Sequence, residues 1–231
     1  MHSDKKTAIS VGALYIAATV AGLLSVVFAG PISEKPLNLF NIAAAEQQVL
    51  IVAYLQIILA VTVAGIAFMV YPILKEDANT NLKKGLVVWY VSTRLTEGAL
   101  FFVGVLNVLL LLKLSQGFVL AEAADASWYA SAGTLIFTAS EHSWMLGQTI
   151  FCIGAAMFYY LLFKSKRIPG WLSIWGLIAT PLMFIANFLP LYGIDSTSVT
   201  YSSLCAPMGV QEMVLAVWLI VKGFNPSVVK D

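Results

Sequence analysis

The chain has 231 residues, of which 60% are hydrophobic and 11% are charged, and its formal net charge is +1. A soluble domain carries about 25% charged residues, so a soluble fold of this size would lack the polar groups to cover its surface. The near-neutral charge, together with the absence of a long basic patch or a Gly-rich phosphate loop, argues against a nucleic-acid partner. The composition predicts an integral membrane protein.

Six apolar runs are long enough to cross a membrane as helices, because a hydrocarbon core about 30 Å thick takes about 20 helical residues. The first run is longer than the apolar part of a cleaved signal peptide, so it is expected to stay as a helix. A proline or a charged cluster ends most of the runs, as expected of stop signals. We predict an all-α bundle in a single integral membrane domain over residues 1–231, with spans at 8–30, 48–74, 85–112, 141–163, 170–191 and 203–221.

Two predicted connections, 31–47 and 113–140, are longer than a tight turn. Both carry apolar side chains among their acidic residues. Within the second, segment 118–130 could form a short helix in the membrane interface, with Trp128 and Tyr129 at the level of the lipid headgroups. An ordered loop is the alternative, and the sequence leaves both open.

The distribution of lysine and arginine predicts the orientation of the chain. One set of connections and termini holds ten of these residues, the other holds Lys35 and Lys113, and Arg94 lies inside a span. Because cytoplasmic segments are enriched in lysine and arginine, both termini are expected to be cytoplasmic. The ten residues are Lys5, Lys6, Lys75, Lys83, Lys84, Lys164, Lys166, Arg167, Lys222 and Lys230.

Four segments resemble an uncharacterised bacterial membrane family, domain of unknown function 4386. The resemblance spans nearly the whole chain, and its clearest parts are a lysine-rich loop before an Ile-Pro pair, an Arg/Glu pair in the third span, and a Glu followed by Trp-Leu in the sixth. It implies a bacterial multi-pass protein and supplies no substrate. The segments are ISVGALYIAATVAGLL at 9–24, STRLTEGALFFVGVL at 92–106, FKSKRIPGWLSIWGLIA at 163–179 and GVQEMVLAVWLIVKGFN at 209–225.

Three charged residues lie inside the predicted spans, where a charge costs at least about 2.5 kcal/mol and therefore usually faces the bundle interior. Arg94 follows Lys84 by ten residues, and Glu212 precedes Lys222 by ten. At 1.5 Å per residue, both lie roughly 15 Å deep. Glu97 shares a helix face with Arg94 at the i,i+3 spacing. We expect Arg94 to pair with Glu97, Glu212 or both.

This charged group has two possible roles. It could be an architectural ion-pair network that joins the third helix to the sixth, because an unpaired buried charge is costly. It could also line a functional pocket, because its formal charge of −1 leaves one carboxylate either protonated or available to a ligand. The sequence favours neither role.

Further polar residues are expected above this level, toward the non-cytoplasmic side. At 1.5 Å per residue from the lysine anchors, Gln56 lies roughly 28 Å up and His142 roughly 33 Å up. Glu141 and Gln148 share one face of the fourth helix, while His142 could instead be solvated at the interface. Together these positions predict a cleft that opens outward. The candidate ligand-binding residues are Arg94, Glu97, Glu212, Gln148, Gln56, His142 and Glu141.

No motif points to catalysis, a metal or a cofactor. The sequence contains neither HExxH nor GxSxG, and His142 is the one histidine near a span. Cys152 and Cys205 lie in apolar runs without CxxC spacing, so buried inert thiols are expected. We predict no catalytic residue, no metal site and no cofactor.

Tryptophans such as Trp144 are expected to form belts at the membrane interfaces. Five glycines are expected to allow close contacts between helices. They are Gly98, Gly104, Gly147, Gly154 and Gly176.

The sequence thus favours a non-enzymatic protein of the bacterial inner membrane, surrounded by lipids, whose outward-opening polar cleft binds a small or lipid-like ligand. A proton- or cation-coupled transporter is one alternative. An intramembrane enzyme and a structural or assembly partner are the others. The oligomeric state is not predicted.

Overall fold

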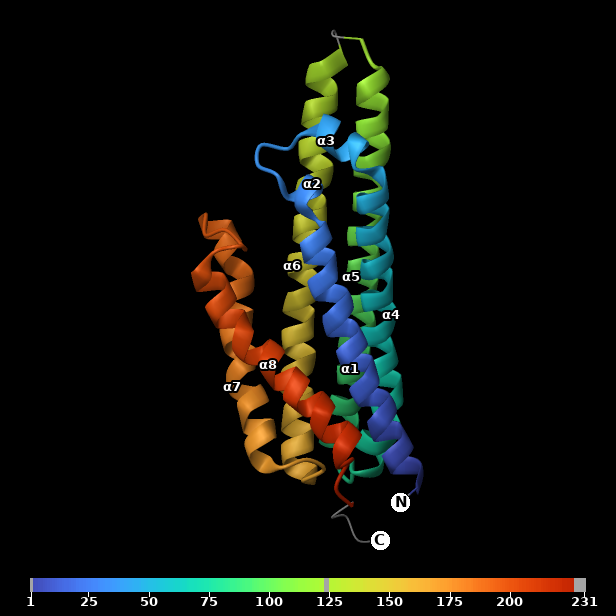
Figure 1. Ribbon diagram of the computed structural model, residues 1–231. Helices are drawn as coiled ribbons and strands as arrows, with labels where there is room; N and C mark the ends of the chain where they lie inside the picture. The colour runs from blue at the N-terminus through green and yellow to red at the C-terminus, as the bar shows by residue number, and fades with distance from the viewer. Residues whose placement is uncertain (1, 123–124, 227–231) are drawn as a thin grey trace.

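Helices dominate the computed structural model, which describes residues 2–122 and 125–226. The described residues contain six helices long and apolar enough to cross a membrane, which confirms the all-α prediction. These helices run alternately up and down the bundle in Figure 1. They are α1 (His2–Phe28), α4 (Glu46–Glu76), α5 (Asn81–Leu120), α6 (Ala126–Ser165), α7 (Gly170–Phe188) and α8 (Val199–Val221), and the shorter ones are α2 (Gly30–Ser33), α3 (Leu39–Ala44) and η2 (Leu189–Tyr192).

Local signals set several of the helix ends. The side chain of Thr80 accepts a hydrogen bond from the Lys83 N–H at the start of α5, and Ser198 does the same for Tyr201 at the start of α8. Such caps satisfy backbone donors that the first turn leaves open. At the end of α6, Lys166 adopts a left-handed backbone conformation (φ 57°), which stops the helix before α7.

Helices α5 and α6 form a long antiparallel hairpin that extends beyond α7 and α8 in Figure 1. Each has 40 residues, a length of about 60 Å and twice the thickness of a hydrocarbon core. The predicted connection over 113–140 is therefore wrong, because helix α5 continues to Leu120 and α6 begins at Ala126. The hairpin is stabilised by its own apolar contacts, such as the ring contact between Phe118 and Tyr129.

The connection over 31–47 is compact rather than extended. It contains α2 and α3, and α3 packs against the outer part of α5, where the Phe40 and Phe118 rings meet at 4.8 Å. The side chain of Asn38 caps α3 by accepting hydrogen bonds from two backbone N–H groups. These contacts hold the outer end of α1 close to the α5–α6 hairpin.

Glycine allows close helix packing at four of the five expected positions. A Cβ atom on Gly176 would lie 2.6 Å from the Tyr159 ring, and one on Gly147 would lie 2.6 Å from the Phe101 ring. Gly154 faces the Thr93 side chain in the same way, and Gly98 faces the carbonyl group of Ala60. The prediction is wrong for Gly104, which has no such neighbour.

A glycine that the sequence did not single out, Gly12, marks the closest approach of α1 and α8. A Cβ atom there would lie 2.6 Å from the Ala216 carbonyl oxygen and 2.7 Å from the Ile220 side chain. Both contacts are near the end of the bundle that holds the termini. Farther along, α7 and α8 lean away from the other helices, as Figure 1 shows. The two groups of helices thus meet closely at one end of the bundle and separate toward the other.

Arg167, in the turn between α6 and α7, joins several segments at the end near the termini. Its Nε atom donates to Asp77 Oδ2 at 2.6 Å, and its Nη2 atom donates to Glu76 Oε2 at 2.8 Å. Nη1 donates to the Asn225 carbonyl and lies 3.8 Å from the Asp4 carboxylate. Burial alone would lower the pKa of Arg167, but the hydrogen bond with Asp77 and the nearby acids raise it overall. We call these five residues the basal ion cluster.

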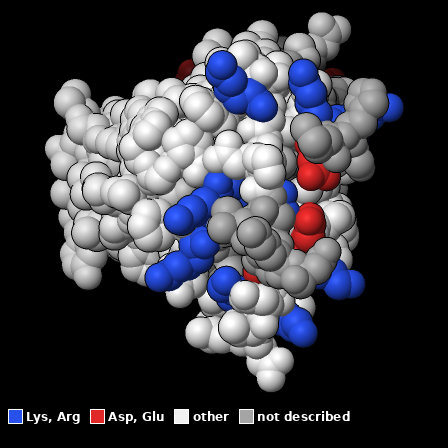
Figure 2. All heavy atoms as spheres, turned by 90° about the horizontal axis from the view of Figure 1, so that it is seen from below, with Lys and Arg blue, Asp and Glu red and all other residues white. Residues whose placement is uncertain are grey.

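The lysine-rich connections and the first and last described residues lie at this same end, where Lys and Arg side chains gather in Figure 2. If this end is cytoplasmic, a reporter that is active only in the cytoplasm should be active when fused after Asp231. The same reporter inserted next to Lys35 should be inactive, because the single crossing by α1 places Lys35 on the side opposite to the termini. Fusions in intact cells, compared at equal expression, check this. Equal activity at both positions would contradict the predicted topology.

Candidate functional site

A polar cavity of about 150 Å³ lies between the six long helices, and each of them contributes at least one side chain to its wall. Four of the residues singled out in the sequence line it: Arg94 and Glu97 from α5, Gln148 from α6 and Glu212 from α8. The other wall residues are Tyr15, Ala18, Thr19, Leu59, Val63, Ile66, Phe101, Trp144, Phe151 and Met183.

Arg94 and Glu97 form a buried ion pair, with 2.9 Å between Nη1 and Oε2, as the sequence predicted. Each side chain is only 4% exposed. The Arg94 guanidinium also lies 5.1 Å from the centre of the Phe151 ring, a distance suited to a cation–π contact. Within the described residues, Arg94 Nε and Glu97 Oε2 complete no hydrogen bond. The pair is therefore close but incompletely satisfied.

Glu212 is the second carboxylate of the cavity, and it comes from α8. It forms no ion pair with Arg94, so the pairing of Arg94 is with Glu97 alone. Both paired residues belong to α5 and are three positions apart, so their contact joins no two helices. Within the described residues, α5 and α8 are therefore not joined by a direct Arg94–Glu212 ion pair, although both side chains line the same hollow.

Gln148 and an aromatic pair lie on the α6 side of the cavity. The Gln148 side-chain oxygen accepts a hydrogen bond from the Tyr201 hydroxyl at 3.1 Å, which links α6 to α8. The rings of Trp144 and Phe101 stack with their centres 4.6 Å apart. Trp144 was predicted to be part of an interfacial belt, and its ring packs against Phe101 of the neighbouring helix.

Buried polar groups also continue from the cavity toward the lysine-rich end. The Tyr159 hydroxyl donates to the side-chain oxygen of Gln211, whose amide donates to the Leu172 carbonyl at 3.1 Å. Tyr90, one helical turn from Arg94, is 1% exposed and stacks on Phe158. These contacts join α6, α7 and α8 below the cavity.

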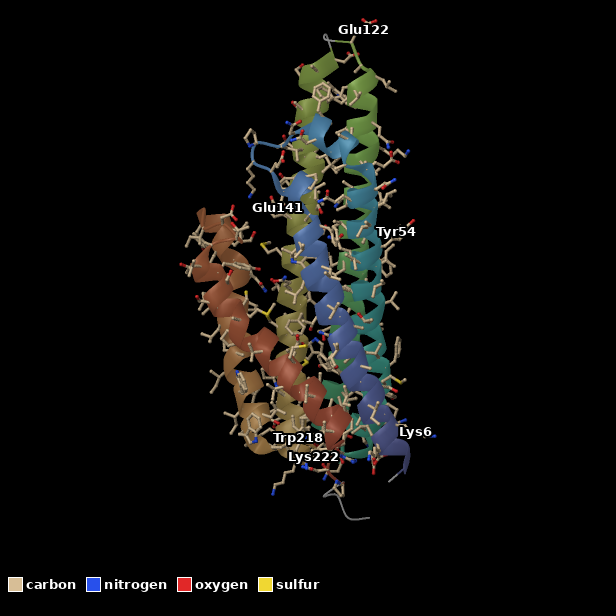
Figure 3. All side chains as sticks on the ribbon, in the orientation of Figure 1. Lys6, Tyr54, Glu122, Glu141, Trp218 and Lys222 are labelled. Carbon is tan, nitrogen blue, oxygen red and sulfur yellow. The ribbon has the colours of Figure 1, made fainter. Side chains whose placement is uncertain are left out.

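The remaining three predicted site residues do not line the cavity. Gln56 is half-buried in α4, while Glu141 and His142 are exposed on α6. Glu141 instead pairs with Lys35 at 3.4 Å, and Lys35 also contacts Asp195 at 3.3 Å (Figure 3 labels Glu141). For Gln56 and His142 the depth estimate gave a height along the helix but not the side of the helix. Glu141 was placed on the same face as Gln148, but it lies seven residues, or about 10 Å, farther along α6.

The outer ion pairs around Lys35 are exposed and contribute little to stability. Such pairs are worth about 0–1 kcal/mol. Hydrogen bonds from the Thr197 N–H and hydroxyl, and then the contact with Lys35, hold the pKa of Asp195 below its ordinary value. The group connects the α2–α3 segment, α6 and the η2–α8 connection at the end of the bundle opposite to the termini.

Several wall residues were missed, although a spacing signal existed for some of them. Phe101 follows Arg94 by seven positions, and Trp144 and Phe151 flank Gln148 by four and three. These spacings place each aromatic residue on the polar face of its helix. Tyr15 carries no comparable signal, because α1 contains no charged residue near it.

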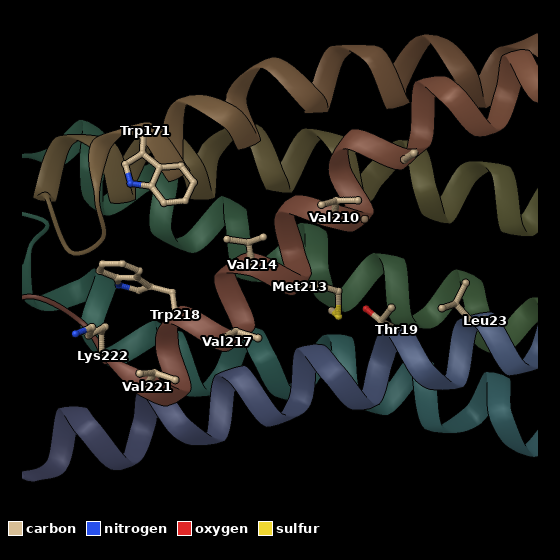
Figure 4. A pocket seen from close by; sticks show the side chains of 12 residues that line it. Thr19, Leu23, Trp171, Val210, Met213, Val214, Val217, Trp218, Val221 and Lys222 are labelled. Carbon is tan, nitrogen blue, oxygen red and sulfur yellow. The ribbon is translucent and has the colours of Figure 1, made fainter.

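An apolar groove with a volume of about 790 Å³ runs along an exposed face of α8. Figure 4 shows its wall, which α1 and α7 complete on either side of α8. Trp171, Trp218 and Lys222 lie toward the lysine-rich end, whereas Leu23 lies toward the opposite end. Thr19 lines both this groove and the polar cavity, so the two hollows adjoin at α1.

The described part of the chain contains no group of three or more His, Cys, Asp or Glu residues placed to hold a metal ion. Cys152 is buried and Cys205 is half-buried, and both are free thiols.

The geometry defines an integral membrane protein whose six long helices line a small hollow that contains charged side chains. The chain belongs to the family described as Domain of unknown function (DUF4386), whose model matches residues 10–223 and therefore includes Arg94, Glu97, Gln148 and Glu212. No curated protein and no solved structure matches the chain.

Proposed function

We propose that this chain binds a small molecule within the bacterial inner membrane, in the cavity beside Arg94, Glu97 and Glu212. The observation that carries the proposal is the buried Arg94 Nε atom, which has no hydrogen-bond partner among the described residues, beside two carboxylates that line the same hollow of about 150 Å³. Buried polar groups nearly always have a hydrogen-bond partner. A hollow of this volume can hold a few waters or a molecule the size of benzene.

The placement of the charges supports a binding role over an architectural one. The Arg94–Glu97 contact lies within one helix, so it contributes nothing to joining helices. Glu212, on α8, faces the same hollow without an ion pair to Arg94. A carboxylate that is kept inside a membrane at considerable cost and serves no internal pair is typical of a site for a ligand or an ion.

Two features support access from the outer side and from the lipid. Helices α1 and α8 meet closely at Gly12 and Ala216, on the lysine-rich side of the cavity, and separate beyond it. The apolar groove adjoins the cavity at Thr19, so a ligand with a hydrocarbon part could place that part against α8. A small amphiphilic ligand fits this combination, with membrane lipids filling the groove in its absence.

A transporter is the second candidate, and one observation favours it. Polar side chains continue below the cavity, at Tyr90, Tyr159 and Gln211. A path through the protein would need such groups on the lysine-rich side. In the conformation described, however, Leu215, Ala216 and Leu219 are fully buried on that side. The two candidates therefore differ in whether reagents reach these positions from the cytoplasm.

Thiol labelling distinguishes the two candidates. In a background with Cys152→Ala and Cys205→Ala, a cysteine at position 148 should react with a membrane-impermeant reagent applied from outside. Cysteines at 216 and 219 should react from neither side, because both positions of α8 are fully buried inside the bundle. Right-side-out vesicles expose the outer face of the membrane to the reagent, and inside-out vesicles expose the cytoplasmic face. Mass spectrometry measures the fraction of each cysteine that is modified.

Each labelling outcome has one interpretation. Reaction at 216 or 219 from the cytoplasmic face would favour the transporter. An unreactive cysteine at 148, in a protein that is otherwise folded, would contradict the outward-opening cavity.

A further inference from the structure

We infer that the ligand group held in the cavity is a small organic cation, an alkylammonium; this inference rests on the proposed binding function and specifies its ligand class. The charges of the wall, its aromatic faces and its size each favour a cation over an anion or a neutral molecule.

The first argument is the balance of charge. One cation, Arg94, and two acids, Glu97 and Glu212, face the hollow. Arg94 already has two neighbours for its positive charge, the Glu97 carboxylate and the Phe151 ring. An anionic ligand would compete with Glu97 for Arg94 and would lie near the like charge of Glu212. A cation instead meets Glu212 as its counter-ion and brings the formal charge of the group from −1 to zero.

The second argument is the aromatic wall. The stacked rings of Phe101 and Trp144 and the ring of Tyr15 line the same hollow as Glu212. Aromatic faces attract ammonium groups, and cages of such rings recognise quaternary ammonium ligands. The absence of a side chain at Gly147 lets the Phe101 ring lie directly against α6. The wall thus combines a carboxylate with fixed aromatic rings, which suits an ammonium group.

The third argument is size. A volume of about 150 Å³ corresponds to roughly five water molecules at 30 Å³ each. A trimethylammonium group is compact enough for this space, whereas a sugar or a nucleotide is too large. A longer alkyl chain on the nitrogen could leave the cavity beside Thr19 and continue into the apolar groove.

Charge-paired reagents test the inference directly. In the Cys152→Ala, Cys205→Ala background, a cysteine at position 148 is exposed to two methanethiosulfonates, one bearing trimethylammonium and one bearing sulfonate. A cysteine at exposed Ser131, on the outer part of α6, corrects for the intrinsic reactivity of each reagent. We expect the cationic reagent to react at least tenfold faster at 148 after this correction. Glu212→Gln should reduce that preference several-fold, whereas the exposed control Glu122→Gln should leave it unchanged.

A binding measurement provides a second, independent readout. Tetramethylammonium should raise the melting temperature of the purified protein in a concentration-dependent way, because a ligand of the folded state stabilises it. Neutral 3,3-dimethyl-1-butanol and anionic trimethylacetate, of similar shape, should raise it less. Trp144→Leu should weaken the tetramethylammonium effect, and it serves as the second variant if Glu212→Gln does not fold.

The outcomes separate this inference from the proposed function. If position 148 reacts from outside but equally with both reagents, or if trimethylacetate stabilises more than tetramethylammonium, the ammonium assignment is overturned and the cavity remains a binding site of another class. If 148 reacts with neither reagent and tetramethylammonium has no effect on melting, the outward-opening site itself is refuted.

Discussion

Replacing Arg94 with leucine is expected to lower the free energy of unfolding by about 3–5 kcal/mol, the usual cost of removing one member of a buried ion pair. The substitution leaves Glu97 buried at 4% exposure without its cation and Glu212 with no nearby positive charge. It also removes the contact between the guanidinium and the Phe151 ring. Denaturant titration in mild detergent, followed by circular dichroism, measures the change.

Two companion variants show whether the loss comes from the charge. Arg94→Leu combined with Glu97→Leu should recover much of the stability, because an apolar pair of similar volume often replaces a buried ion pair without loss. Glu212→Gln alone should change stability far less, since Glu212 forms no ion pair with Arg94. If Arg94→Leu lowers the free energy of unfolding by less than about 1 kcal/mol, the Arg94–Glu97 pair behaves like a solvent-exposed ion pair, and the prediction of a buried, dehydrated pair is wrong.

Arg167→Met should produce a second loss of about 3–5 kcal/mol, for the same reason. Arg167 is 1% exposed, and its donors meet both oxygens of Asp77, which is itself buried. Removing the guanidinium leaves that carboxylate without its principal cation in the interior. The same unfolding measurement tests this, with Lys84→Met as the matched control, because Lys84 is an exposed cation at the same end of the bundle.

The Asp77→Asn variant adds a check on the Arg167 result. It keeps the shape of the side chain but removes the charge, so Arg167→Met should cost less in that background than in the native chain. If the two losses are equal, the interaction between Arg167 and Asp77 does not account for the stability.

Much of the fold follows from sequence features that act locally. A run of about 20 apolar residues must be helical inside a membrane, so the six long helices could be counted directly. The Arg94–Glu97 pair was predictable because residues three apart on a helix are neighbours. The length of the α5–α6 hairpin was not predictable in this way. Residues 113–120 and 126–140 extend the two helices, and there α5 contacts α6 and α3.

The parts of the site that sequence reasoning missed depend on contacts between distant segments. Arg167 was counted as one of several basic residues on a cytoplasmic surface. It is buried because Asp77, 90 positions earlier, lies against the same turn. Trp144 was assigned to the interface because tryptophan is common there, yet it packs on Phe101 of the neighbouring helix. Neither partner is visible in the local sequence around these residues.

The basal ion cluster has a mechanical consequence for the opposite end of the molecule. Arg167 precedes α7, and its contact with Asn225 holds the segment that follows α8, so both helices are tethered at the same level. Helix α8 spans 23 residues, or about 35 Å at 1.5 Å per residue. If the pair tilts about this tethered end by about 5°, its opposite end is displaced by about 3 Å over that length. A small change at the base is thus amplified at the opposite ends of α7 and α8.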